Sequence, residues 1–95
     1  MATNIKRGKF MLEKDIEQSL VKHIKAKGGL CIKLNSSTMA GLPDRLVILK
    51  NKIIFIELKA PKQKPRKLQT VIMGKLKSLG CDVRVIDNLE DIKNI

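Results

Sequence analysis

The fold of this 95-residue chain is decided by residues 43–59, which read PDRLVILKNKIIFIELK. Two β-rich runs within it, at 44–49 and 53–59, are separated by Lys50-Asn51-Lys52. Two runs of β-branched and aliphatic residues around so short a polar segment are typical of a β-hairpin. We therefore expect two antiparallel neighbouring strands, which together form the centre of a sheet.

Three charged side chains fall at the open end of this hairpin. Asp44 begins the first run, whereas Glu57 and Lys59 lie near the end of the second. Counted from a turn at residues 51–52, Asp44 falls opposite or nearly opposite Lys59 and one diagonal from Glu57, close enough to share an ion. Two carboxylates can hold a divalent cation, which activates water for attack on a phosphodiester. A cross-strand salt bridge explains the same spacing, and the spacing alone does not distinguish the two.

The flanking segments alternate between helical and strand periodicity. The expected elements are a helix from Leu12 to about Lys27, a strand at Leu30–Leu34, a loop at 35–43, a helix from about Pro65 to Leu79, a strand at Cys81–Ile86 and a short helix begun by Asp87 with Glu90. The buried stripes expected on the two long helices are Leu12, Ile16, Leu20 and Ile24, and Leu68, Ile72, Leu76 and Leu79.

The order α-β-β-β-α-β-α predicts an α/β fold with a mixed four-stranded sheet flanked by helices. The first three strands form an antiparallel meander, and the crossover after the third makes the fourth strand parallel to it. Residues 1–10 read as a flexible basic arm, and residues 11–95 as one domain.

Composition indicates a polyanionic partner. The chain has 20 Lys and Arg against nine Asp and Glu, a net charge of +11, and neither Trp nor Tyr. With two Phe as its only aromatic side chains, the chain has few groups on which bases could stack, so we expect contact with the nucleic-acid backbone. A basic binding module without catalysis would have the same charge.

The sequence shows no sign of a zinc site, a membrane span or a signal peptide. Cys31, Cys81 and His23 lack the spacing of a zinc site, so the cysteines are expected to be buried free thiols. No apolar run is long enough to span a membrane, and the N-terminus lacks the apolar core of a signal peptide. We expect a soluble protein in the cytoplasm.

The first helix offers a third carboxylate. Glu17 falls inside the apolar arc and would point at the sheet, where a metal ion or Lys59 would offset the cost of burying its charge. Glu13, one turn earlier, is the competing candidate, although an acid in the first turn also interacts favourably with the helix dipole. We favour Glu17.

The second long helix and the segment just before it contain the remaining candidate site residues. Gln69 lies at the edge of the apolar stripe and either reaches the carboxylates or is a surface amide. Lys62, Lys64, Arg66 and Lys67 begin directly after Lys59 and are either a solvated linker or phosphate contacts; we favour the contacts.

In sequence order, these motifs resemble the PD-(D/E)XK nuclease superfamily, and within it the small stand-alone VRR-NUC domains of bacteria and phages. The resemblance covers Glu13 to Ile92. It rests on helical Glu17, Gly-Leu-Pro-Asp at 41–44, Glu-Leu-Lys at 57–59 and helical Gln69. The two spacings, Asp44 to Glu57 and Glu17 to the glycine, are also similar to those of archaeal Holliday-junction resolvases.

This resemblance implies a restriction-endonuclease-like core and a structure-selective DNA endonuclease that uses Mg²⁺ or Mn²⁺ and leaves 5′-phosphate ends. It implies Asp44 and Glu57 as metal ligands, helped by Glu17 and the backbone carbonyl of Leu58. Lys59 would position or activate the attacking water, and Gln69 would support the site. It also implies a homodimer that cuts four-way junctions or other branched DNA; a flap or restriction-type nuclease is the alternative.

Overall fold

The computed structural model describes residues 11–35 and 37–95, so the predicted basic arm at 1–10 lies outside the described residues. Its elements in chain order are α2 (Glu13–Ala26), β1 (Leu30–Lys33), β2 (Arg45–Leu49), β3 (Lys52–Leu58), α3 (Lys67–Ser78), β4 (Asp82–Ile86) and α4 (Leu89–Lys93). This order confirms the predicted one.

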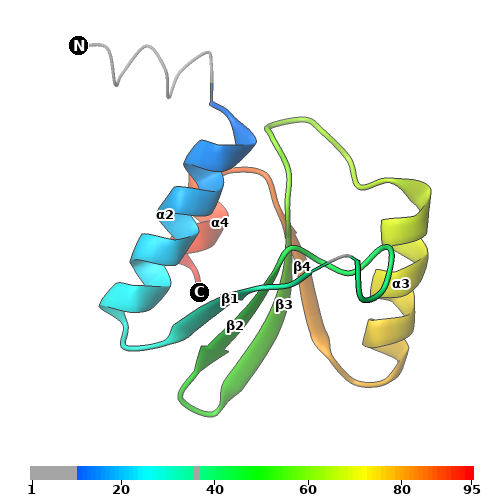
Figure 1. Ribbon diagram of the computed structural model, residues 1–95. Helices are drawn as coiled ribbons and strands as arrows, with labels where there is room; N and C mark the ends of the chain where they lie inside the picture. Colours follow the sequence, from blue (N-terminus) through cyan, green and yellow to red (C-terminus); the bar gives the residue numbers. More distant parts are fainter. Residues whose placement is uncertain (1–10, 36) are drawn as a thin grey trace.

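The four strands form one sheet in the order β1-β2-β3-β4. β1, β2 and β3 pair antiparallel, and β4 pairs with β3 in parallel, which confirms the predicted meander and crossover. Figure 1 shows α2 and α4 on one side of the sheet and α3 on the other. Within the described residues, no helix is long and apolar enough to cross a membrane.

The core lies between the sheet and the pair α2 and α4. Ile16, Leu20 and Ile24 of α2 are fully buried against Val47, Ile54 and Ile56 of the sheet, with Leu58, Ile86, Ile92 and Ile95 completing the cluster. The stripe predicted for the first helix is therefore confirmed except at Leu12. That residue stands just before the helix and is half exposed.

The buried stripe predicted for the second helix is wrong by one position. α3 buries Gln69 and Met73, whereas Leu68 and Leu79 are exposed. The rotation follows from the loop before β2. A Cβ placed on Gly41 would lie 2.8 Å from Ile72 and 3.0 Å from Leu68, so these two side chains pack under the loop rather than into the sheet.

The alternation of the first strand places Leu30, Ile32 and Leu34 on one face and Cys31 and Lys33 on the other, but the larger apolar side chains are not on the buried face. Leu30 and Ile32 are 58% and 41% exposed, while Cys31, on the other face, contacts the core cluster. The reason is that α3 packs on β4 at the far side of the sheet and leaves β1 uncovered on that face. Both cysteines are free, as predicted, but half-buried.

The hairpin turn lies one position earlier in the chain than predicted. Leu49 pairs with Lys52, so the turn is Lys50-Asn51, and Asn51 adopts the left-handed conformation with φ of 59°. The pairing of Arg45 with Ile56 then sets Asp44 next in line with Glu57. The predicted register, with Asp44 opposite Lys59, is therefore off by two residues, because moving a two-residue turn by one position changes the partner of every residue by two.

The last helix begins one residue later than predicted. Asn88 caps α4 by accepting a hydrogen bond from the backbone N–H of Asp91 at 2.8 Å, in place of the predicted pair Asp87 and Glu90. The Asp87 carboxylate instead accepts a hydrogen bond from the Asn88 side chain. The cap therefore goes to the residue whose oxygen reaches the helix, and this shift does not affect the candidate site.

Candidate active site

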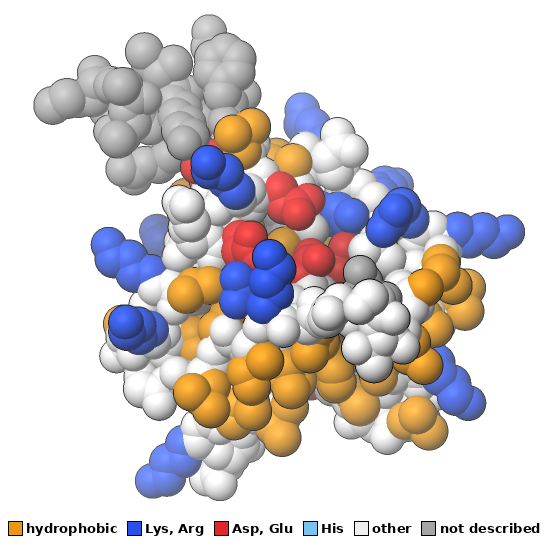
Figure 2. Space-filling view, viewed as in Figure 1, with side chains coloured by type: hydrophobic (Ala, Val, Ile, Leu, Met, Phe, Trp, Pro, Cys, Tyr) orange, Lys and Arg blue, Asp and Glu red, His pale blue; other side chains and the backbone are white. Residues whose placement is uncertain are grey.

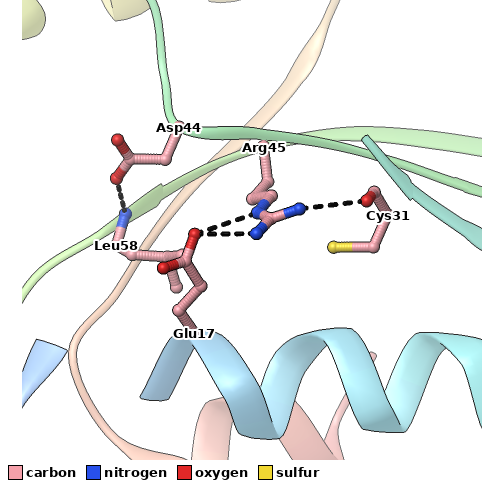
Figure 3. A network of polar contacts seen from close by, with 5 residues as sticks. All are labelled: Glu17, Cys31, Asp44, Arg45 and Leu58. Carbon is pink, nitrogen blue, oxygen red and sulfur yellow. Dashed lines mark hydrogen bonds and ion pairs between the residues drawn. The ribbon is translucent and has the colours of Figure 1, made fainter. Parts of the chain in front are cut away.

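Asp44 is fixed at the point where β2 begins. Pro43 before it is buried, and the carbonyl oxygen of Asp44 accepts a hydrogen bond from the N–H of Leu34 at 2.8 Å. Its carboxylate Oδ2 accepts another from the N–H of Leu58 at 2.9 Å (Figure 3). The side chain is thus tied to the end of β3, and among the described residues Oδ1 has no hydrogen-bond donor.

Glu57 is a completely buried carboxylate. Its exposed fraction is 0%, and neither carboxylate oxygen has a hydrogen-bond partner among the described residues. The Lys59 ammonium forms an ion pair with Oε2, with Nζ at 3.3 Å. A buried charge without hydrogen bonds is costly, and the ion pair with Lys59 offsets only part of that cost for Glu57.

The electrostatics of Glu57 reflect this position. Burial raises the pKa of Glu57 above its ordinary value, and the negative charge of Asp44 raises it further. Contact with Lys59 opposes the rise in pKa, and Glu13 adds a smaller increase. The negative charge of one carboxylate disfavours ionisation of the other, and a cation bound between them would offset this repulsion.

Glu17 is paired with Arg45, a partner that the sequence analysis did not identify. Its Oε2 accepts hydrogen bonds from both Nη2 and Nε of Arg45, at 2.9 and 3.1 Å, and Arg45 also donates to the carbonyl of Cys31 at 3.2 Å. Figure 3 shows this network between α2 and the sheet. Arg45 therefore offsets the cost that was assigned to a metal ion or Lys59.

The signal for this pairing was present in the sequence. Arg45 directly follows Asp44, and neighbouring side chains of a strand project to opposite faces. Because Asp44 shares a face with Glu57, Arg45 must point at the helix that carries Glu17. All hydrogen bonds of the Glu17 carboxylate go to Oε2, which leaves Oε1 without a donor among the described residues.

Glu13 lies within electrostatic reach of Glu57, because its charge contributes to the raised pKa of that group. It is exposed, and among the described residues no ion pair or hydrogen bond fixes its carboxylate. The two helical acids thus differ: Arg45 orients Glu17, whereas Glu13 has no such partner in the described part of the chain. The choice of Glu17 stays a prediction.

Gln69 is buried, with only 7% of its surface exposed. Its Oε1 accepts a hydrogen bond from the N–H of Arg66 at 3.0 Å, which caps the start of α3. Reading it as a surface amide is therefore wrong. The structure gives it no contact with the carboxylates, so its support of the site also stays a prediction.

The basic stretch Lys62, Lys64, Arg66 and Lys67 is exposed throughout. Among the described residues, none of these four side chains forms an ion pair, so all four charges are open to a ligand. Figure 2 shows acidic side chains gathered near the middle of the visible face, with Lys and Arg side chains around them. An acidic centre within a basic surround suits a metal ion bound to a polyanion.

The residues present fit a hard divalent cation. Within the described part of the chain, no group of three or more His, Cys, Asp or Glu side chains forms a metal cluster, so the donors are Asp44 and Glu57 with backbone or solvent oxygens. Oxygen donors are those that Mg²⁺ prefers, and it commonly binds through one or two carboxylates. The orphaned oxygens of Glu57 are the observation that favours such an ion.

Comparison with known proteins relates the chain to nucleases at the level of both sequence and structure. No protein-family model matches the chain. It is 41% identical over 88 residues to "Putative nuclease p44" of Acyrthosiphon pisum secondary endosymbiont phage 1, a match covering 92% of this chain and 94% of that protein. A solved structure described as a VRR-NUC domain is similar with a TM-score of 0.79 and 28% identity, over 86% of this chain and 90% of the other.

Proposed function

Because this chain belongs to the VRR-NUC family of nucleases, we propose that it is a metal-dependent endonuclease that hydrolyses phosphodiester bonds in branched DNA. The buried, donor-free carboxylate of Glu57 beside Asp44 is the observation that carries this proposal. A buried anion that the fold leaves unsatisfied is expected where a ligand completes the site.

Asp44 and Glu57 would hold the metal ion, Mg²⁺ or Mn²⁺, together with the carbonyl of Leu58, and Glu17 would assist through a solvent oxygen. A divalent ion in that position supplies Lewis-acid stabilisation of charge on the phosphate and lowers the pKa of water. The Leu58 N–H fixes Asp44 by its hydrogen bond at 2.9 Å. Lys59, paired with Glu57 at 3.3 Å, places a positive charge where it can orient water and stabilise the charge that develops on the phosphate.

The decisive experiment is a cleavage assay on a four-way junction beside its linear arms, a flap and a duplex of matched sequence, with Mg²⁺ or Mn²⁺ and with EDTA. We expect metal-dependent cutting of the junction that leaves 5′-phosphate ends, and slower cutting of the linear arms. Equal rates on all substrates would remove the selectivity for branches, and preference for the flap would assign the alternative task. Absence of cutting on every substrate would contradict the enzyme.

A basic binding module without catalysis is the second candidate, supported by the net charge of +11. The Asp44→Ala variant separates the two. A nuclease loses metal-dependent cleavage and keeps junction binding, whereas a binding module has no cleavage to lose.

The exposed basic stretch is proposed as the main phosphate contact. Replacing Lys62, Lys64, Arg66 and Lys67 by Gln should weaken DNA binding and lower its salt slope by up to about 3.6, because each neutralised phosphate contributes about 0.9. Four exposed lysines elsewhere, Lys22, Lys25, Lys75 and Lys77, provide the matched control set. An unchanged slope would place the phosphate contacts elsewhere on the surface.

We also propose a homodimer that joins through the uncovered sheet face. Leu30 pairs with Ile48, and Ile48 with Ile53, so these residues form an apolar row across three strands, and both ends of the row are 58% exposed. In a strongly basic chain, an uncharged patch is where two copies repel each other least. A two-fold dimer also supplies the two symmetric cuts that a junction requires.

Sedimentation tests the dimer and its surface. Ile53→Lys should yield a monomer, whereas Val71→Lys, on the equally exposed outer surface of α3, should leave the dimer intact. The reverse pattern would move the interface to α3, and a monomeric wild type would contradict the dimer.

A further inference from the structure

A cleft next to the proposed metal site contains a polar group that the described fold does not use. The cleft has a volume of about 260 Å³ and is lined by Ala40, Gly41, Arg66, Leu68 and Gln69. Gly41 lies three residues before Asp44, so the wall of the cleft is continuous in sequence with the carboxylate centre. Its other wall is the first turn of α3.

The loop wall requires glycine. Gly41 has φ of +87°, in the left-handed region, and an added Cβ would lie 2.8 Å from Ile72 and 3.0 Å from the backbone carbonyl of Leu68. The loop backbone therefore lies directly against α3. The cleft therefore depends on the close packing of the Gly41 loop against α3, which requires a glycine at this position.

The side-chain amide of Gln69 uses its oxygen in a hydrogen bond, whereas its NH₂ group forms none among the described residues. The Arg66 N–H is a donor, so the atom that faces it must be the amide oxygen, which fixes the orientation of the amide. The NH₂ group then has no hydrogen-bond acceptor among the described residues, although the side chain is 93% buried, being 7% exposed. The amide nitrogen is not one of the fully buried unpaired atoms, so it is accessible at the cleft, where its two N–H donors suit a ligand with acceptor oxygens.

The charge around the cleft specifies an anion. The first turn of α3 has no acidic residue, and the N-terminus of a 12-residue helix carries a partial positive charge. The exposed guanidinium of Arg66 lines the same cleft, and Lys67 follows it in the chain. Donors, dipole and side-chain charge therefore all favour oxyanions.

We propose that this cleft binds a second phosphate of the DNA strand, one that neighbours the phosphate being cut. The proposal rests on the proposed function, since it takes DNA as the ligand. The Gln69 NH₂ donates to a phosphate oxygen, and Arg66 pairs with the same group. Gln69 thus binds the DNA strand in addition to capping the helix.

The informative variant is Gln69→Glu. Glutamate at the third position of a helix accepts the same backbone N–H, so the cap and the fold are kept, while the donor becomes a negative acceptor. We expect about tenfold weaker binding of a metal-free four-way junction and a salt slope lower by about one. Gln63→Glu, the same change on an exposed amide of the basic stretch, is the matched control and should have a smaller effect.

An independent measurement uses the unaltered chain. The side-chain NH₂ resonances of Gln69 in ¹⁵N-labelled protein should shift on titration with metal-free junction DNA and saturate together with binding. Equal losses of affinity in the two glutamate variants, or an unshifted Gln69 amide at saturation, would overturn the proposal. Saturation by inorganic phosphate alone, without a response to DNA, would also overturn it.

This outcome is separable from that of the proposed function. If the wild type cuts no DNA but Gln69→Glu still weakens junction binding more than Gln63→Glu, the phosphate subsite stands and the nuclease fails. If Asp44→Ala abolishes cleavage while Gln69→Glu binds like the control, the nuclease stands and the subsite is wrong.

Discussion

Glu17 and Glu57 are two carboxylates at the same end of the molecule, and the fold treats them in opposite ways. Glu17, on α2, receives two N–H donors from Arg45 on a single oxygen. Glu57, at the end of β3, is fully buried and receives no hydrogen bond among the described residues. The first acid thus has both an ion pair and hydrogen bonds, whereas the second has only an ion pair with Lys59, so their substitutions should behave differently.

The largest expected difference is in catalysis. Glu57→Gln should lower the rate of metal-dependent junction cleavage by at least about 10³-fold, because it removes a proposed metal ligand. Junction binding without metal should persist. Cleavage rates with saturating enzyme, together with a binding assay in EDTA, measure both effects. A Glu57→Gln variant that cuts at a normal rate would contradict the proposed centre.

The helical acids should show a smaller effect. Glu17→Gln is expected to slow cleavage about tenfold, since Arg45 orients Glu17 toward the sheet, and Glu13→Gln less than about twofold. The same junction assay measures both variants. Equal effects would remove the role assigned to the orientation of Glu17. A larger effect of Glu13→Gln would make Glu13 the helical acid, in keeping with its influence on the pKa of Glu57.

Glu57→Gln and Glu17→Gln should change the free energy of unfolding in opposite directions. Without metal, Glu57→Gln should raise the free energy of unfolding by about 1 kcal/mol, because it removes a buried charge. Glu17→Gln should lower it by about 1 kcal/mol, since the ion pair with Arg45 is partly exposed and screened. Urea unfolding in EDTA measures both, and changes of the same sign would contradict the contrast.

The stabilising effect of Glu57→Gln should depend on pH. Because burial raises the pKa of Glu57 in the folded protein, the ionised wild type carries its full penalty above that pKa. As the pH falls through the folded pKa toward the ordinary value, the folded state takes up a proton first and gains stability. The difference between variant and wild type in EDTA should therefore shrink on acidification. A constant difference would mean that Glu57 does not titrate in this range.

The order of elements could be predicted because each has strong local signals. The β-rich run at 53–59 and the periodicity of Ile16, Leu20 and Ile24 depend on neighbours in the chain. The faces of β1 and α3 were not predictable in this way. Leu30 is exposed because α3 covers β4 at the other edge of the same sheet face, and Leu68 packs under Gly41, and neither arrangement is encoded in local sequence.

The site was predictable at the level of residues but not of contacts. Asp44 and Glu57 could be found from the hairpin, although the two-residue turn changed which residues stand opposite. The pairing of Glu17 with Arg45 joins residues 28 positions apart and depends on how α2 crosses the sheet. The cap that buries Gln69 required knowledge of where α3 starts, which is the least certain part of any periodic pattern.

The two-residue turn between β2 and β3 has a consequence for how this protein can change during evolution. Because side chains alternate along a strand, one residue inserted between Lys50 and Asn51 and absorbed as a shift of register would send either Asp44 or Glu57 to the opposite face. Every catalytic side chain would remain in the sequence, yet the pair would be separated. Length variation among relatives should therefore be confined to segments such as 35–42, while the short turn keeps a fixed length.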